Sequence, residues 1–199
     1  MEKIKGRLIK TGYKVLNVDY PSTDYGLEAL AEKINKEVSS FNPPSTRRLH
    51  FVTYSMGGLV ARALIKKYRP GNLGQVVMLG PPNQGSEMAD FLKDNVLFQK
   101  FYGPAGQELG THQESIRALL GDVDFNLGVI AGDRSIDPIG SFLIPGSDDG
   151  KVSVEHTKLK GMKDHIIIHA THTFMMKNEE VISQILHFLE TGRFKREKP

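Results

Sequence analysis

The 199-residue sequence contains no cysteine, no tryptophan and no long uninterrupted apolar run. The lack of cysteine excludes a disulfide framework and any site built on a thiolate. A membrane-spanning helix needs about 18 or more consecutive apolar residues, so the sequence predicts no transmembrane segment. The first twelve residues are rich in lysine and arginine and have no apolar core, unlike a secretory signal peptide. We therefore expect a cytoplasmic protein without disulfides.

The sequence also has little net charge. Its 26 lysines and arginines exceed its 23 aspartates and glutamates by only three, and the basic tail over 192–199 holds much of the excess. Such a small surplus does not favour a nucleic-acid partner, and the sequence gives no signal for a protein partner. The length suits a single domain, and no repeat or linker interrupts it. We expect one domain over residues 1–199.

Apolar runs typical of strands alternate with segments of helical periodicity along most of the sequence. Strands are predicted over 13–19, 49–54, 75–79, 127–131 and 165–169. Helices are predicted over 1–10, 26–40 and 179–189, and mainly helical structure over 86–120. A further helix is predicted to follow the strand at 49–54 without a loop, to include residues 59–65 and to end before Pro70. Because the strands are nearly continuous apolar runs, we expect an α/β fold: a mostly parallel sheet flanked by helices on both faces, as a three-layer sandwich.

The segment Thr53–Gly58 carries the most specific signal. Ser55 lies between a predicted strand and a predicted helix, and Gly57 follows two residues later. This matches the strand–turn–helix context of the G-x-S-x-G nucleophile elbow, with Thr53 in place of the first glycine. Such a turn strains the serine backbone and lifts the hydroxyl to the carboxyl edge of the sheet. The N–H of Met56 would then face an oxyanion near the positive end of the helix. The alternative is an ordinary buried serine at a helix start.

An activated serine needs a base, and the base needs an acid to orient it. Downstream of Ser55, the best loop carboxylates are Asp148 and Asp149, and the best histidine is His172, just past the last predicted strand. The order serine, acid, histidine is typical of folds with this elbow. The alternative is that Asp149-Gly150 is a solvated turn, since Asp-Gly is a common turn dipeptide.

The remaining polar candidates favour structural roles. His165 and His169 flank a predicted strand, and Asp133-Arg134 suggests a local ion pair or turn. His169 and His172 have a spacing that a metal pair can use, but no third ligand is grouped with them. We therefore predict no metal and no cofactor.

With these motifs, nearly the whole sequence resembles the α/β-hydrolase family, specifically its bacterial lipase and esterase-like members. Gly80–Ser86 is similar to a segment of such lipases that follows the first strand after the nucleophile elbow. Asp148–Val154 is similar to their acid loop, in which the carboxylate directly before glycine orients the histidine. His172–Met175 is similar to the segment that carries the base.

The resemblance implies a cofactor-free serine hydrolase that acts through an acyl-enzyme on small-molecule or lipid esters. Ser55 would be the nucleophile, His172 the base and Asp149, rather than Asp148, the orienting acid, with the Met56 N–H in the oxyanion site. The predicted helical segment 86–120 would form a cap over the acyl site. The acyl chain length, and the choice among ester, thioester and amide, stay open.

The resemblance also indicates a gap at the amino terminus. Family members have a strand ending in His-Gly, which supplies a second oxyanion N–H, whereas this sequence contains no His-Gly and begins within the helix that follows. We expect an N-terminally shortened fold in which the segments 13–19 and 49–54 pair directly or leave unpaired backbone groups. Losing one oxyanion donor costs about 10²–10³ in turnover. The alternative functions are a catalytically silent binding or scaffold domain and an acyl transferase.

Overall fold

Four parallel strands form the central sheet of this computed structural model, which describes residues 1–41, 46–85, 104, 120–136 and 144–196. The strands are β1 (Leu49–Tyr54), β2 (Leu73–Leu79), β3 (Leu127–Gly132) and β4 (Asp164–Ile168), and they lie in this order across the sheet. β2 and β3 occupy the middle, and all six residues of β3 are buried. Four of the five predicted strands are thus confirmed, with ends shifted by at most two residues.

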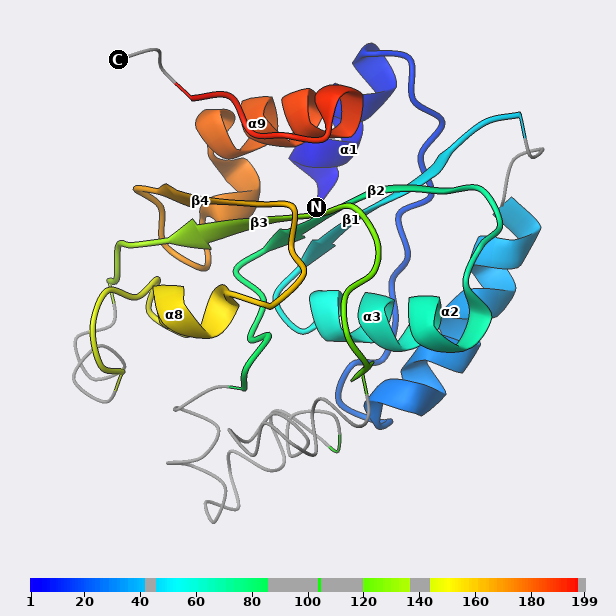
Figure 1. Cartoon of the computed structure of the whole chain (residues 1–199), viewed down its shortest axis with the longest axis horizontal. Helices are drawn as coiled ribbons and strands as arrows, with labels where there is room; N and C mark the ends of the chain where they lie inside the picture. The colour runs from blue at the N-terminus through cyan, green and yellow to red at the C-terminus, as the bar shows by residue number, and fades with distance from the viewer. Residues whose placement is uncertain (42–45, 86–103, 105–119, 137–143, 197–199) are drawn as a thin grey trace.

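Helices cover both faces of this sheet (Figure 1). α1 (Glu2–Lys10) and α9 (Glu179–Thr191) lie on one face, and α2 (Leu27–Phe41) and α3 (Gly57–Tyr68) lie on the other. Two short helices, α8 (Val154–Thr157) and η1 (Met175–Lys177), lie in loops near the sheet. The three-layer α/β arrangement predicted from the sequence is confirmed. Within the described residues, no helix is long and apolar enough to cross a membrane.

Local sequence explains how the last helix is placed. Asn178 caps α9 by accepting hydrogen bonds from the N–H groups of Glu180 and Val181, and Gly192 ends the helix with a left-handed backbone (φ 74°). The ring of Phe188 then packs so closely on β3 that a Cβ at Gly128 would lie 2.4 Å from it. The absence of a side chain at Gly128 therefore lets α9 lie against the sheet.

The segment 13–19, predicted to be a strand, is not one. It has no strand assignment and does not pair with β1, which is bonded to β2 alone among the described strands. Its half-buried apolar side chains, such as Val15 and Val18, still pack against the two main core clusters. The apolar pattern correctly indicated a segment packed on the core, but strand formation also requires a backbone partner, and the described residues do not provide one.

The predicted cap over 86–120 lies almost entirely outside the described residues.

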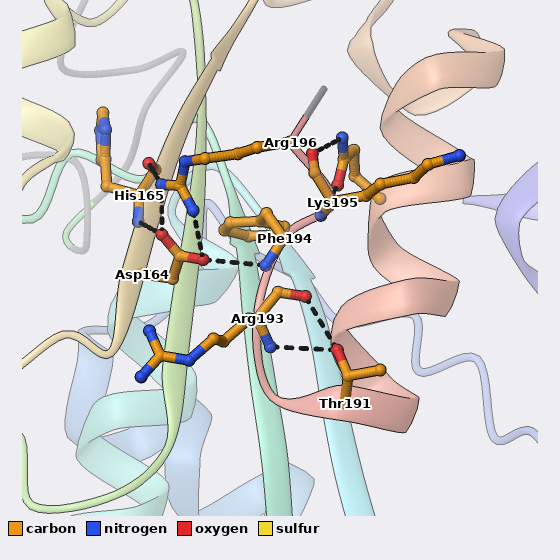
Figure 2. A network of polar contacts seen from close by, with 8 residues as sticks. Asp164, His165, Thr191, Arg193, Phe194, Lys195 and Arg196 are labelled. Carbon is orange, nitrogen blue, oxygen red and sulfur yellow. Dashed lines mark hydrogen bonds and ion pairs between the residues drawn. The ribbon is translucent and has the colours of Figure 1, made fainter. Parts of the chain in front are cut away.

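Residues 194–196 of the carboxyl-terminal tail are bound to β4 and α9 (Figure 2). Asp164 accepts hydrogen bonds from the Phe194 N–H (2.8 Å) and from the Arg196 guanidinium (2.6 and 3.1 Å). Phe194 is 4% exposed and packs on Phe188. Burial alone would raise the pKa of Asp164, but Arg196 and the backbone N–H donors outweigh burial and hold it below its ordinary value. The first part of the tail thus belongs to the fold.

We expect Asp164→Asn to lower the free energy of unfolding at pH 7 by about 1–3 kcal/mol, because several charge-assisted hydrogen bonds are weakened. A depressed pKa contributes stability that is present above the unfolded value of about 3.9 and is lost as the pH falls through the folded value. The difference between Asp164→Asn and the parent should therefore shrink below about pH 4. Urea denaturation at pH 7 and pH 3 measures both effects.

Asp124→Asn is the matched control, because Asp124 forms an exposed ion pair with Arg69. Exposed pairs contribute about 1 kcal/mol or less, so this variant should change little at either pH. Equal effects of the two substitutions at pH 7 would contradict a stabilising role for the Asp164 network.

Candidate active site

Ser55 occupies the turn between β1 and α3 in a strained conformation. Its φ of 53° is the one positive φ at a non-glycine position within the described residues. A non-glycine residue held in such a conformation costs about 1–3 kcal/mol, so the surrounding structure must enforce it. The Ser55 N–H donates to the Leu79 carbonyl (2.8 Å) at the end of β2, and the Ser55 carbonyl accepts from the Gly58 N–H (3.0 Å). The strained turn predicted from the sequence is present.

Close packing explains the two glycines after Ser55. A Cβ at Gly57 would lie 3.3 Å from the Tyr20 hydroxyl, and a Cβ at Gly58 would lie 3.1 Å from both Met78 Sδ and Pro81 Cβ. A larger residue at Gly57 or Gly58 would require these neighbouring side chains to shift by a few tenths of an ångström.

The structure brings Ser55, His172 and Asp149 together in one hydrogen-bonded chain, although they lie far apart in sequence. His172 Nε2 lies 3.0 Å from Ser55 Oγ, and His172 Nδ1 lies 2.7 Å from Asp149 Oδ2. Asp149 is 2% exposed and His172 is 8% exposed, so the contact between them is shielded from water. In this geometry an Nδ1–H is held by the carboxylate, which leaves Nε2 free to accept the serine proton.

The acid loop distinguishes the two neighbouring aspartates. Asp149 Oδ1 accepts hydrogen bonds from the N–H groups of Lys151 (3.0 Å) and Val152 (2.9 Å), so that Oδ2 is directed at the imidazole. The His172 N–H also donates to the Asp149 carbonyl (2.8 Å). Asp148 Oδ1 accepts from the Gly150 N–H and shapes the turn. The contact with the imidazole is thus made by Asp149.

Met56 is the N-terminal cap of α3, directly after Ser55. Within the part of the chain that the structure describes, its N–H donates to no other group of the chain. An N–H at a helix start adds to the positive end of the helix dipole, which favours negative charge. This donor therefore suits a developing oxyanion beside Ser55.

Two further residues lie against the imidazole, and sequence reasoning assigned neither of them a role there. The Tyr54 hydroxyl donates to the His172 carbonyl (3.0 Å), and the two rings lie 4.9 Å apart. Gly80 has a φ of 51°, and a Cβ there would lie 2.9 Å from Asp149 Oδ2 and 3.0 Å from His172 Nδ1. Sequence reasoning placed Tyr54 within the elbow segment 53–58 and Gly80 at the start of the segment 80–86, without a contact to His172 for either. Their roles depend on contacts more than 60 residues away in the sequence.

A buried arginine organises the loop after β2. Arg62 on α3 donates to the carbonyl and side-chain oxygens of Asn83 (3.4 Å each) and to the Gly121 carbonyl (3.0 Å). Asn83 in turn donates to the Thr157 carbonyl (2.8 Å) in α8. Burial lowers the pKa of Arg62 to about 10, which still leaves the guanidinium protonated at neutral pH. Arg62 thus links α3 to the loop after β2 and, through Asn83, to α8.

The other candidate polar residues lie apart from this hydrogen-bonded chain. His165 contacts the Thr157 hydroxyl (2.9 Å), and burial lowers the pKa of His165. Asp133, for which the sequence suggested a local pair with its neighbour, instead contacts the exposed imidazole of His169 (2.9 Å). In the described ranges, histidine and carboxylate side chains do not form any group of three that could hold a metal ion.

Comparison with known proteins finds similarity in structure alone. No family model and no curated protein matches the sequence. The mature form of the Bacillus licheniformis lipase BlEst2 superposes with a TM-score of 0.77 at 20% identity, over 94% of this chain and 83% of that one. Its propeptide form gives 0.79 at 21% identity, over 99% and 48%. The phospholipase PlaB from Legionella pneumophila gives 0.72 at 16% identity, over 96% and 55%.

The chain therefore spans about half the length of two of these three structures. At identities near 20%, the similarity establishes the fold and not the activity. The parallel sheet and the flanking helices match solved lipases and esterases over almost the whole of this chain. The chain has the α/β-hydrolase fold.

Proposed function

We propose that the protein is a cofactor-free serine hydrolase that cleaves carboxylic esters. The observation that carries this proposal is the continuous hydrogen-bonded chain from Ser55 Oγ through His172 to the buried Asp149. The strained backbone at Ser55 supports it, because strain of this kind is retained where function requires it. The solved structures with the same fold include lipases, a phospholipase and esterases, which supports an ester or lipid ester substrate.

The proposed reaction has two halves. Ser55 Oγ attacks the ester carbonyl while His172 Nε2, 3.0 Å away, takes the hydroxyl proton. The imidazolium then gives that proton to the leaving alcohol, and an acyl-enzyme on Ser55 remains. Water, deprotonated by His172, releases the acid in the second half. Asp149 holds the Nδ1–H and stabilises the imidazolium, and the Met56 N–H donates to the oxyanion.

Hydrolysis of p-nitrophenyl esters tests this function. We expect turnover above the buffer rate for at least one ester in a series from acetate to palmitate, and the preferred length would define the acyl class. Thioester and anilide analogues with the same acyl chain would distinguish the bond type. A lack of turnover across the series would contradict the hydrolase proposal and favour a silent binding domain.

A further inference from the structure

The loop after β2 supplies hydrogen-bond donors to the short helix α8. A helix leaves its last four carbonyl groups without a partner inside the helix, and α8 has only four residues, so most of its carbonyls need donors from elsewhere. Asn83 Nδ2 donates to the Thr157 carbonyl (2.8 Å). The N–H and Nε2 of Gln84 donate to the other three carbonyls of residues 155–158 (3.1 Å each). We call these contacts of Asn83 and Gln84 with residues 155–158 the clamp.

Asn83 is in turn held by Arg62, the buried arginine of α3. Asn83 and Arg62 are each 2% exposed. Asn83 Oδ1 accepts a hydrogen bond from the guanidinium of Arg62, while Nδ2 of the same amide donates to Thr157. Because one end of the amide faces a donor and the other an acceptor, its orientation is fixed. The clamp is therefore anchored on α3, the helix that begins two residues after Ser55.

On its other side, the clamp holds a helix that follows directly on the acid loop. The N-terminal cap of α8 is Ser153, whose Oγ accepts from the His156 N–H (3.2 Å). The N–H of Val154, the first residue of α8, donates to the Ser147 carbonyl (2.8 Å). This hydrogen bond closes the loop in which Asp149 lies. A displacement of α8 would therefore move Asp149 as well.

The two segments that the clamp joins also meet at the Asp149–His172 contact. A Cβ at Gly80, where the loop after β2 begins, would lie 2.9 Å from Asp149 Oδ2, so the backbone of this loop approaches the carboxylate closely. Asn83 follows three residues later. In Figure 1 the chain after β2 passes between α8 and the start of α3, in agreement with the hydrogen bonds of Asn83 to both helices. The clamp thus fixes the acid loop relative to the loop that lies against it.

We propose that Asn83 and Gln84, anchored by Arg62, are positioning residues that act through α8 to hold Asp149 Oδ2 against His172 Nδ1. An aspartate that moves away from the imidazole no longer fixes its tautomer, which lowers kcat more than it alters substrate binding. The effect on turnover rests on the proposed hydrolase function. The effect on the acid loop does not, so the two can be measured separately.

Asn83→Asp tests the clamp with a side chain of the same shape. The aspartate can still accept from Arg62, but it has no N–H to donate to the Thr157 carbonyl. The backbone N–H groups of residues 151 and 152, which donate to Asp149 Oδ1, report on the acid loop. We expect their amide hydrogen exchange to become about tenfold faster or more. We also expect kcat for ester hydrolysis to fall by about 10–100-fold, with KM changed by less than about twofold.

Asn72→Asp is the matched control for this substitution. Asn72 is also buried (6% exposed), and its Nδ2 also donates to a backbone carbonyl, that of Arg47 (2.8 Å). It lies directly before β2, at the other end of this strand from Gly80. Asn72→Asp should change neither the exchange of residues 151–152 nor kcat by more than about twofold, even at an equal loss of Tm.

Gln84→Glu is a second clamp variant, for the case in which Asn83→Asp does not fold. Gln84 is only half-buried, and the substitution removes the Nε2 donor while the backbone N–H to His156 stays. We expect the same two changes at a smaller size, about threefold each.

Two results would overturn the inference. The first is unchanged exchange of residues 151–152 in the folded clamp variants. The second is an equal change of exchange and kcat in Asn72→Asp, because a general loss of stability would then explain both. Faster exchange in the clamp variants of a chain that cleaves no ester would support the clamp and contradict the hydrolase function alone.

Discussion

Replacing Ser55 with alanine is expected to lower kcat for p-nitrophenyl ester hydrolysis by about 10⁴–10⁶-fold, with little change in KM. Removing a serine nucleophile leaves only binding and oxyanion stabilisation to accelerate the reaction, and the members of such a triad act as a unit. Ser55 Oγ is the atom that contacts His172 Nε2. No other group of this hydrogen-bonded chain can therefore replace it as the nucleophile. Steady-state kinetics on the preferred ester measures the effect.

Two further serine variants separate lost chemistry from lost folding. Ser39→Ala changes an exposed serine on α2 and should keep the parent kcat. Ser55→Gly should be as inactive as Ser55→Ala. Its unfolding temperature should be higher than that of Ser55→Ala, because glycine adopts the φ of 53° without strain. Substantial turnover by Ser55→Gly would contradict the assignment of Ser55 as the nucleophile.

Asp149→Asn is expected to lower kcat by about 10⁴-fold while the fold is retained. The asparagine side chain has the same shape, but its NH₂ group can donate to His172 and so favours the wrong imidazole tautomer. The proton would then reside on Nε2, which could no longer take the proton of Ser55. Kinetics of the folded variant, with circular dichroism as the check on folding, measures this effect.

Asp148→Asn is the matched control for this experiment. It removes the neighbouring charge and keeps an oxygen that can accept the Gly150 N–H, and Asp149 Oδ2 still contacts His172. We expect kcat to change by less than about tenfold, because the tautomer of His172 is preserved. A larger loss with Asp148→Asn than with Asp149→Asn would assign the orienting role to Asp148 instead.

Much of the fold could be predicted because it depends on local pattern. The runs at 76–79 and 127–131 contain no polar side chain, which is typical of strands covered on both faces, and they form the centre of the sheet. Ser55 could be singled out because the elbow needs a strand, a strained serine and a helix within a few residues. Asp149 and His172 could be singled out only through their order along the chain and the resemblance to a known family.

The rest depends on contacts that leave no local signal. Segment 13–19 has a strand-like pattern, but a strand also requires a hydrogen-bonding neighbour, and the sequence left open whether this segment pairs with the strand at 49–54. Arg62 lies among apolar helix residues, and its burial depends on acceptors from Asn83 and Gly121. The contact of the Tyr54 hydroxyl with His172 depends on the placement of a loop more than 100 residues later.

Covalent labelling with a fluorophosphonate shows whether Ser55 is an activated nucleophile. Digestion with trypsin yields the peptide 49–62, in which Ser55 is the one serine. We expect mass spectrometry to find the phosphonyl adduct on this peptide, and we expect labelling to be lost in Ser55→Ala and strongly slowed in Asp149→Asn. An adduct confined to another serine, or equal labelling of Ser55→Ala, would show that Ser55 is not the nucleophile.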